Sequence, residues 1–315
     1  MKNFSKDPLS IAIIGAGVMG RGIAQVAASV GINVILHDLD EAVVNDAVDF
    51  VYKMLERAKE KGRMSETELA ISKSCISKSS ELENLADADL VIEAIIENIE
   101  VKQSLFKQLE ATVSDDCILA TNTSSLSVTS VAANCRLPDR VAGFHFFNPV
   151  PLMKLVEVIS AIRTSAAVVE QLQALSKRLG HTPVLVNDSP GFLVNHAGRG
   201  LITEGLRVLH ENITDVQVVD EVMRDCLGFR MGPFELMDLT GLDVTFPASP
   251  TASAPSEATF NASVAVSTCL AGRLKNPLNA VFHPVNLVGT SGTFGVSGNL
   301  GTSSAKPKNV FSPFF

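Results

Sequence analysis

Two residues in one short segment have the types and the spacing to move a proton. His145 and Glu157 each lie six residues from Pro151, one on either side. The run that ends at His145 and the run 154–159 have the composition of β-strands, and the Asn-Pro-Val-Pro segment between them must turn. If the two runs pair, His145 and Glu157 become cross-strand neighbours with Cβ atoms about 5 Å apart.

Such a pair is suited to acid–base chemistry. A carboxylate beside an imidazole favours the protonated ring and determines which ring nitrogen carries the proton. A dehydrogenase needs a base of this kind, because the proton of the substrate hydroxyl must leave as hydride is transferred. We therefore identify His145 as the candidate general base and Glu157 as its partner. The alternative is a core histidine whose hydrogen bonds serve only the fold.

A glycine-rich segment near the N-terminus has the pattern of a dinucleotide-binding loop. Gly15, Gly17 and Gly20 form G-x-G-x-x-G between an apolar run and a helical pattern. The first glycine allows a tight turn, the second lets the backbone approach a pyrophosphate, and the third lets the helix pack close to the sheet. Phosphates would then lie at the helix N-terminus.

Asp38 favours NAD over NADP as the cofactor. It follows the next apolar run, 18 residues after Gly20, where its carboxylate can accept hydrogen bonds from the adenosine ribose. The negative charge of Asp38 would repel a 2′-phosphate. A structural glycine turn beside a solvated aspartate is the alternative interpretation.

The elements that must position these residues alternate between strands and helices. Short apolar runs predict the strands, and apolar residues at helical spacing predict the helices between them. The pattern predicts strands at 10–14, 33–36, 90–92, 117–120 and 141–144, and helices at 18–30, at 41–61 and after Asn98. This alternation indicates an α/β fold, a Rossmann-type doubly wound sheet covered by helices.

A smaller all-α domain is predicted to follow this sheet. Its helices are predicted to start at Ser189-Pro190, at a Thr214–Gln217 capping box and at Gly232-Pro233. Gly228 is predicted to end the second of them. We therefore divide the chain into an NAD-binding domain, residues 1–187, and a helical domain for substrate binding and dimerisation, residues 188–245.

The composition changes after Thr245. Residues 246–315 hold one acidic residue, four basic residues and seven of the fourteen prolines of the chain. We expect a Ser/Thr/Pro-rich, poorly ordered tail that leaves the helical domain incomplete, with unpartnered apolar faces near Leu236 and Leu242. A shifted reading frame and a fused unrelated segment would both produce such a tail, and we favour the first.

The overall composition excludes several classes of protein. Hydrophobic residues make up 46% and charged residues 19%, and the net charge of −8 argues against general nucleic-acid binding. We expect no membrane span and no signal peptide, because no apolar stretch is long enough. The five cysteines form no Cys-x-x-Cys pair, so we expect neither a disulfide framework nor a metal site. These features predict a cytoplasmic protein.

Six segments together resemble one known family over about residues 8–245. They are GAGVMGRGIAQ, VIEAIIENIEVKQSLF, ATNTSSLSV, GFHFFNPVPLMKLVEVI, SPGFLVNH and MGPFELMDLTGLDV. They resemble the NAD-dependent L-3-hydroxyacyl-CoA dehydrogenases, the family of the 3-hydroxybutyryl-CoA dehydrogenases. The resemblance implies reversible oxidation of the 3-hydroxyl of an acyl-CoA to a ketone, as in the β-oxidation of fatty acids. It also implies a homodimer.

The resemblance implies roles for individual residues. By motif position, His145 matches the general base of the family and Glu157 its partner carboxylate. Ser124 and Asn195 match the residues that hydrogen-bond the substrate oxygen. Positions near the nicotinamide half of NAD are matched by Glu97, Lys102 and Asn148.

Each of these roles has a structural alternative. Ser124 could cap a helix. Asn195, six residues into the helix predicted to start after Ser189, could make a buried hydrogen bond between helices. Glu97 and Lys102 could be plain surface charges on either side of the helix cap.

Two other functions remain open from the sequence. A dehydrogenase of the same fold could act on a free hydroxy acid that carries no coenzyme A. Alternatively, the protein could bind NAD without turnover, because its helical domain is incomplete. The His145–Glu157 pair favours the acyl-CoA dehydrogenase.

Overall fold

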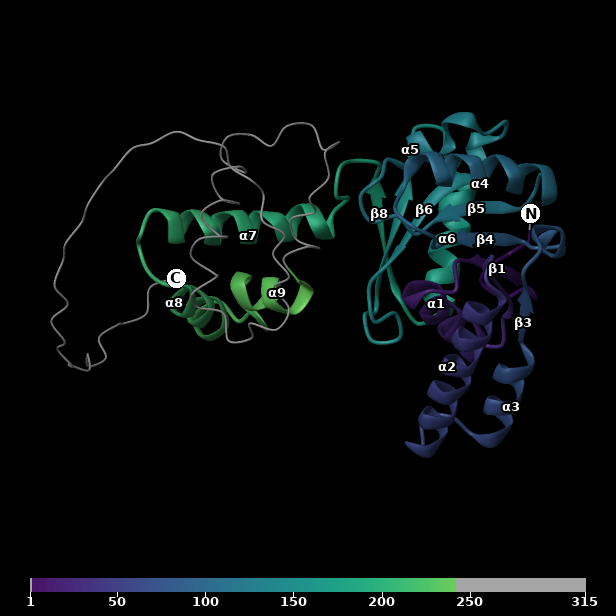
Figure 1. The fold of residues 1–315 in the computed structure, drawn as a ribbon, viewed down its shortest axis with the longest axis horizontal. Helices are drawn as coiled ribbons and strands as arrows, with labels where there is room; N and C mark the ends of the chain where they lie inside the picture. Colours follow the sequence, from purple (N-terminus) through teal and green to yellow (C-terminus); the bar gives the residue numbers. More distant parts are fainter. Residues whose placement is uncertain (1, 242–315) are drawn as a thin grey trace, which may run out of the picture. The chain divides into compact units, whose positions relative to one another are not determined.

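A computed structural model describes residues 2–241 of the chain (Figure 1). One eight-stranded sheet forms its centre, with the strand order β3-β2-β1-β4-β5-β6-β7-β8. The strands are β1 (Ser10–Ile14), β2 (Asn33–His37), β3 (Ile76–Ser79), β4 (Leu90–Glu93), β5 (Ile118–Thr121), β6 (Val141–Phe146), β7 (Leu155–Ser160) and β8 (Thr182–Asn187). Neighbouring strands are parallel except β6 and β7, which are antiparallel.

Helices connect these strands and continue beyond the sheet. They are α1 (Val18–Ser29), α2 (Glu41–Glu60), α3 (Glu66–Ser74), α4 (Ile99–Thr112), α5 (Val128–Val131), α6 (Ala166–Arg178), α7 (Val194–His210), α8 (Val216–Glu221) and α9 (Pro233–Thr240). Short helical turns add η1 (Leu82–Leu85), η2 (Ala132–Asn134), η3 (Pro138–Arg140) and η4 (Val222–Cys226). Within residues 2–241, no helix is both long enough and apolar enough to cross a membrane.

The predicted fold class is confirmed, and the sheet contains strands that the sequence pattern did not indicate. The strand β3 has the sequence ISKS, with one apolar residue, and lies at one edge. At the other edge, β8 contains Pro183, which an edge strand tolerates because one side of its backbone has no partner. The strand β3 has no apolar run, and in β8 the apolar run VLV follows a proline, which in a sequence pattern counts against a strand.

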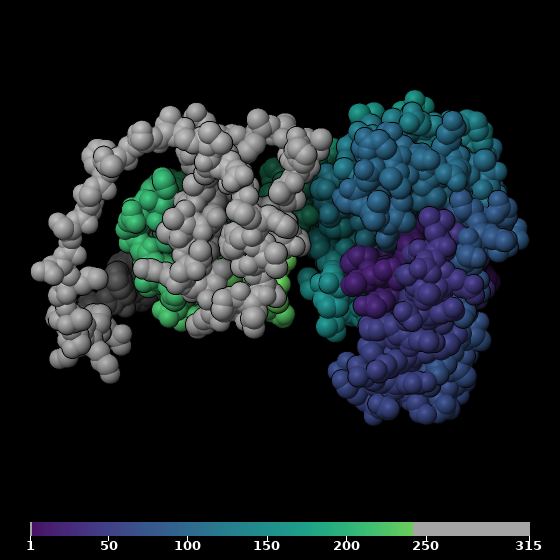
Figure 2. All heavy atoms as spheres, viewed as in Figure 1, coloured from purple at the N-terminus to yellow at the C-terminus, as the bar shows by residue number. Residues whose placement is uncertain are grey.

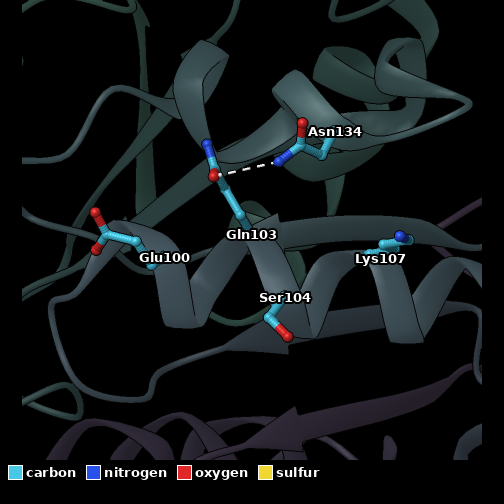
Figure 3. Close-up of a pocket in the computed structure, with 5 residues that line it drawn as sticks. All are labelled: Glu100, Gln103, Ser104, Lys107 and Asn134. Atoms are coloured by element: carbon cyan, nitrogen blue, oxygen red, sulfur yellow. Dashed lines mark hydrogen bonds between the residues drawn. The ribbon is translucent and has the colours of Figure 1, made fainter.

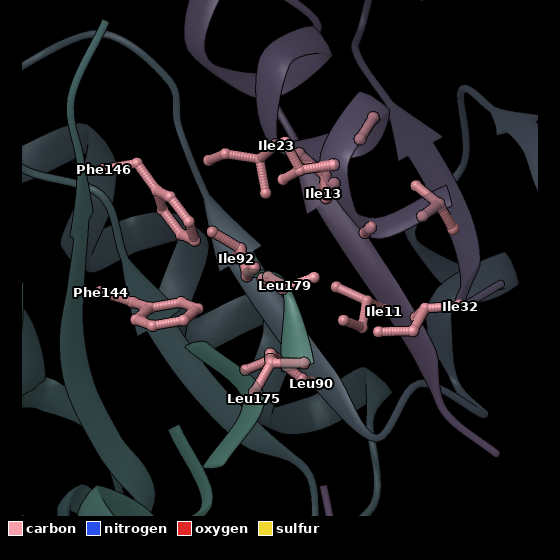
Figure 4. Close-up of a cluster of buried hydrophobic side chains, with 14 of the residues drawn as sticks. Ile11, Ile13, Ile23, Ile32, Leu90, Ile92, Phe144, Phe146, Leu175 and Leu179 are labelled. Carbon is pink, nitrogen blue, oxygen red and sulfur yellow. The ribbon is translucent and has the colours of Figure 1, made fainter. Parts of the chain in front are cut away.

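The hydrophobic core lies on both faces of the sheet. Along β1, Ile11 and Ile13 belong to one buried cluster, whereas Ala12 and Ile14 belong to the other. This alternation follows from the two-residue period of a strand whose faces are both covered. Figure 4 shows the first cluster, where side chains of β1, α1, β4, β6 and α6 meet.

The first helix after the sheet begins later than predicted. Ser189-Pro190 does not start a helix; α7 starts at Val194, and Leu193 is its N-terminal flanking residue. Phe192 has a left-handed backbone conformation, with φ of 50°, which interrupts any helix there. The backbone N–H groups at the start of α7 are instead bound by a side chain from β7, as described below.

The later helix boundaries agree more closely with the sequence. Gly232 precedes α9, and Pro233 is its first residue, as predicted. The cap of α8 was misplaced by one residue, because the Asp215 side chain accepts from the Val218 N–H and no Thr214–Gln217 box forms. Gly228, with φ of 73°, follows the end of η4. The domain division at 187/188 stays a prediction, and the predicted tail lies outside the described residues.

Gly143 in β6 tests how tightly one face of the sheet is packed, the face whose buried cluster contains Ile159 and Val128. A Cβ atom there would lie 2.7 Å from Ile159 Cβ and 2.9 Å from Val128 Cγ2. We expect Gly143→Ala to lower the free energy of unfolding by about 1–3 kcal/mol, because β7 and α5 must both move. At Gly198 in α7 an added Cβ would meet, among residues 2–241, no atom within 4 Å outside the adjacent backbone of its own helix, so Gly198→Ala should lose no stability. Urea titration of both variants measures this, and equal stabilities would contradict the packing.

Candidate active site

The site begins with the antiparallel pair of β6 and β7. Their register places His145 directly opposite Glu157, as the mirror spacing around Pro151 predicted. The Nδ1 atom of His145 lies 2.7 Å from Oε2 of Glu157. Glu157 is fully buried and His145 is 5% exposed, so the hydrogen bond is protected from water. With Nδ1 facing a carboxylate, the proton belongs on Nδ1, and Nε2 is left as the basic nitrogen.

The second oxygen of Glu157 caps a helix. Oε1 accepts hydrogen bonds from the backbone N–H groups of Leu193 and Val194, each at 2.9 Å. Burial would raise the pKa of Glu157, but the hydrogen bonds from His145 and from these two N–H groups outweigh it and lower the pKa below the ordinary value. Glu157 is therefore ionised at neutral pH, and it connects the dyad to α7.

Two aromatic rings flank the imidazole. The ring centroid of Phe147 lies 4.4 Å from that of His145, and the centroid of Phe192 lies at 5.8 Å. Phe192 itself is 3% exposed. These rings restrict the orientation of the imidazole and keep water from its faces.

The two residues predicted to bind the substrate oxygen contact each other. Asn195 Nδ2 donates to the backbone oxygen of Ser124 at 3.2 Å. Because α7 starts at Val194, Asn195 is its second residue and not an interior one. This position corrects the predicted helix interior, and the side chain of Asn195 contacts a loop, whereas the alternative interpretation placed its hydrogen bond between helices. Ser124 is exposed and precedes α5 without being its cap, which is Ser127.

Glu97 joins the same loop from the other side. Its Oε1 accepts from Thr123 Oγ1 at 2.5 Å and from the backbone N–H groups of Ser124 and Ser125 at 3.0 and 3.1 Å. Burial would raise the pKa of Glu97, but the Thr123 hydrogen bond and the Lys102 charge lower it overall. Glu97 is thus a fixed anion and not a plain surface charge.

Lys102 is also no surface charge. It is 1% exposed, and its Nζ lies 2.5 Å from Glu93 Oε1 and 3.3 Å from Glu97 Oε2. Glu93, the last residue of β4, is fully buried and was missed in the sequence analysis. The signal was present, because an acidic residue at the end of the apolar strand LVIE must find a buried partner.

Asp188 is a second residue that the sequence analysis missed. It follows β8, and its two carboxylate oxygens accept from Ser127 Oγ and from the backbone N–H groups of Val128 and Thr129. These donors lie at the N-terminus of α5, where a negative charge is favourable. Asp188, at the start of the connection from β8 to α7, therefore binds this connection to the N-terminus of α5, which follows Ser124 in the chain.

The glycine-rich loop fits a dinucleotide. A Cβ atom on Gly15 would lie 2.5 Å from the oxygen of Ala94, and one on Gly20 would lie 1.8 Å from the oxygen of Gly15. Around Gly17, which precedes α1, a Cβ would meet no protein atom within 4 Å. The first turn of α1 contains no acidic residue. Free backbone N–H groups and an open approach are what a pyrophosphate requires.

Asp38 lies directly beside this loop. It follows β2, and its Oδ2 accepts from the backbone N–H of Ala16 at 2.8 Å. The carboxylate is therefore held next to the expected pyrophosphate position, where it can reach a ribose. Of the predicted cofactor residues, Gly15, Gly17, Gly20 and Asp38 are brought together at this point.

Asn148 lies apart from these contacts, on the exposed connection between β6 and β7. Its peptide bond with Pro149 is cis. Two residues further on, the buried Val150 packs on α1, and a Cβ atom on Gly22 would lie 3.0 Å from Val150 Cγ2. Figure 2 shows the teal atoms of this connection beside the purple atoms of α1. The strand connection that follows His145 is thereby fixed to the helix that follows the glycine loop.

A pocket on the surface of α4 involves none of these residues. It is lined by Glu100, Gln103, Ser104, Lys107 and Asn134 (Figure 3). Gln103 Oε1 accepts from Asn134 Nδ2 at 3.3 Å across it. In the described part of the chain, no group of three His, Cys, Asp or Glu side chains could hold a metal ion.

Comparisons with known proteins identify the family of this chain. Residues 10–189 match the family model of the 3-hydroxyacyl-CoA dehydrogenase NAD-binding domain, and residues 191–282 match that of the 3-hydroxyacyl-CoA dehydrogenase C-terminal domain. The chain belongs to the 3-hydroxyacyl-CoA dehydrogenase family. Its cofactor is accordingly NAD, as Asp38 predicted.

The match with this chain covers a different share of each relative's length. The chain is 44% identical to 3-hydroxyadipyl-CoA dehydrogenase of Escherichia coli over 237 residues, which are 75% of this chain and 50% of that protein. It thus spans about half the length of that relative. It is 40% identical to 3-hydroxybutyryl-CoA dehydrogenase of Clostridioides difficile over 236 residues, 75% of this chain and 84% of that one.

A solved structure resembles this chain over most of the length of both proteins. It is (S)-3-hydroxybutyryl-CoA dehydrogenase PaaH1 from Ralstonia eutropha, with a TM-score of 0.77 and 36% identity. The match covers 84% of this chain and 95% of that one.

The two glycines of the loop should respond differently to a methyl group. Gly17→Ala should cost about 1 kcal/mol of stability or less, because no protein atom blocks its Cβ. It should nevertheless weaken NADH binding at least about tenfold, because the methyl group fills the pyrophosphate approach. Gly20→Ala should lower the melting temperature itself, because its Cβ meets the Gly15 backbone. Fluorescence titration with NADH and thermal melting separate the two effects; wild-type binding by Gly17→Ala would contradict the assignment.

The lowered pKa of Glu157 makes part of the stability depend on pH. The ionised carboxylate stabilises the fold above the ordinary glutamate pKa of 4.5, and this contribution is lost as the pH falls through the lower folded value. Glu157→Gln should therefore be less stable than the parent by about 1–3 kcal/mol at pH 7, and the gap should shrink below about pH 4.5. Urea titrations between pH 3 and 7 measure the gap. The exposed Glu170→Gln serves as control, and a gap for Glu157→Gln that is constant with pH would contradict the prediction.

Proposed function

We propose that this protein catalyses the reversible NAD-dependent oxidation of an L-3-hydroxyacyl-CoA to the 3-ketoacyl-CoA. The observation that carries the proposal is the buried pair of His145 and Glu157, 2.7 Å apart, in a chain with the NAD-binding domain of this family. Bound NAD supplies the acceptor for the hydride that leaves C3 of the substrate. The protein must supply a base for the hydroxyl proton and hold the substrate oxygen in place.

His145 acts as the base through Nε2. Its Nδ1 donates to Glu157, so Nε2 is free to accept the proton of the 3-hydroxyl group. The imidazolium that forms is stabilised by the adjacent carboxylate, which stays ionised. In the reverse direction the same ring returns the proton to the ketone oxygen.

Ser124 and Asn195 hold the substrate oxygen in place. The Asn195 amide uses one N–H for the Ser124 backbone oxygen, which leaves its second N–H for a ligand. Ser124 is exposed on a loop whose backbone is fixed by Glu97, and its hydroxyl lies 3.5 Å from Glu97 Oε1. Fixed donors of this kind stabilise charge on an oxygen without having to reorganise during the reaction.

The acyl-CoA class of substrate is supported by the names of the relatives. The E. coli and C. difficile proteins are named for 3-hydroxyadipyl-CoA and 3-hydroxybutyryl-CoA. Neither of these two names refers to a free hydroxy acid. The role in fatty-acid oxidation belongs to this proposal, while homodimerisation and a cytoplasmic location stay predictions of the sequence.

Turnover of acetoacetyl-CoA with NADH tests the proposal in the reductive direction. We expect the full chain to consume NADH, and His145→Gln to lower kcat by about 10²- to 10⁴-fold without loss of NADH binding. His210→Gln, an exposed histidine at the end of α7, should leave kcat unchanged.

Absorbance and fluorescence of NADH, recorded together, separate the possible outcomes. NADH binding by the parent chain without consumption would replace the proposal by NAD binding without turnover. Equal rates with acetoacetate and with acetoacetyl-CoA would favour the free hydroxy acid instead.

A further inference from the structure

A buried group of charged side chains lies behind the loop that carries Ser124, defined here as the Ser124 loop, residues 122–126. At its centre the Lys102 ammonium group contacts Glu93 Oε1 at 2.5 Å and Glu97 Oε2 at 3.3 Å. Lys102 is 1% exposed and Glu93 is fully buried, whereas the Glu97 side chain is 36% exposed. The three charges therefore form a line from the interior of the sheet to the site.

The inner end of this line is fixed to the sheet. Glu93 Oε2 accepts from Thr121 Oγ1 at 2.7 Å, and Oε1 accepts from the Ile95 N–H at 2.7 Å as well as from Lys102. Glu93 ends β4 and Thr121 ends β5, so the carboxylate joins the carboxyl ends of two parallel strands. Both oxygens have partners, and the carboxylate has no room to rotate.

The outer end of the line holds the Ser124 loop. While Glu97 Oε2 faces Lys102, its Oε1 accepts from hydroxyl and backbone N–H groups of Thr123, Ser124 and Ser125. The position of Oε1 depends on where Oε2 is attached, because both oxygens belong to one rigid carboxylate. The loop is thus located relative to the sheet by Lys102, and Lys102 by Glu93.

We propose that Glu93 is a positioning residue of this enzyme, which fixes the Ser124 loop through Lys102 and Glu97. The proposal rests on the proposed function for the role of Ser124 toward the substrate oxygen. Glu93 itself touches neither substrate nor cofactor. Its contribution is to neutralise part of the Lys102 charge, so that Glu97 can keep its hydrogen bonds with the loop.

Charge balance explains why the neutral variant should disturb the loop. Among the residues that the structure describes, the buried ammonium group in Glu93→Gln keeps only Glu97 as a charged partner. A buried charge that loses one partner is left partly uncompensated, which is costly unless the remaining partner moves closer. We therefore expect Glu97 to move toward Lys102 and to release the donors of Thr123, Ser124 and Ser125.

A double variant separates this role from a purely structural one. Glu93→Gln combined with Lys102→Met removes both buried charges, and replacement of a buried ion pair by neutral groups is often neutral for stability. A purely structural role predicts that the melting temperature and the slow amide exchange of the loop both return to the parent values. A positioning role predicts that the melting temperature recovers while the loop stays mobile, because Glu97 has lost its anchor.

Hydrogen exchange at the Ser124 and Ser125 amides is the decisive measurement, because it needs neither substrate nor turnover. We expect exchange at least about tenfold faster than in the parent for Glu93→Gln and for the double variant. The control is Glu100→Gln, at an exposed position in the first turn of α4 that lines the surface pocket of Figure 3. Parent-like exchange in a folded Glu93→Gln protein, or in the double variant, would overturn the proposal.

Kinetics with acetoacetyl-CoA and NADH provides a second measurement. We expect kcat/KM for acetoacetyl-CoA to fall at least about tenfold in both variants and to stay unchanged in Glu100→Gln. A parent chain without turnover would contradict the proposed function, and the exchange data would still decide the role of Glu93. If Glu93→Gln does not fold, parent-like exchange in the double variant would still overturn the proposal.

Discussion

The site depends on the buried carboxylate of Glu157 and on the different partners of its two oxygens. One oxygen binds the imidazole of His145, and the other binds the two backbone N–H groups that open α7. Burial favours protonation of an isolated carboxyl group, so these three donors are what keep the charge. The helix that carries Asn195 is therefore bound to the same carboxylate that orients His145. Proton transfer and substrate positioning thus both depend on Glu157.

Two further carboxylates likewise connect separate elements of the fold through their two oxygens. Glu93 and Glu97 distribute the charge of Lys102 between the end of β4 and the Ser124 loop. Contacts therefore run from His145 through Glu157 and the start of α7 to Asn195, and onward to the Ser124 loop. Parallel strands bring their carboxyl ends to one edge, which is where such a series of contacts can form and where ligands of open α/β sheets bind.

The glycine loop of the cofactor site is organised by its backbone. The glycine loop leaves open space at Gly17 and close contacts at Gly15 and Gly20, so a single segment combines access with tight packing. Asp38 adds a carboxylate held by the Ala16 N–H. Val150 contacts α1 at Gly22, so the connection after His145 and the helix after the glycine loop are mutually fixed.

The sequence determined whatever depends on local pattern: the glycine loop and Asp38, the main strands, and the His145–Glu157 pair, whose mirror spacing fixed the register of β6 and β7. Tertiary structure decided what depends on partners far away in the chain. Only the fold shows that Glu157 caps α7. The helix therefore starts at Val194 and not at Ser189, where the sequence predicted its start. Only the fold shows that Lys102 is buried against Glu93. Local propensity cannot reveal either contact, because each joins a buried carboxylate to donors from a separate element of the chain. The hydrogen bonds of these carboxylates outweigh the tendency of Ser189 to begin a helix and of a lysine to lie at the surface.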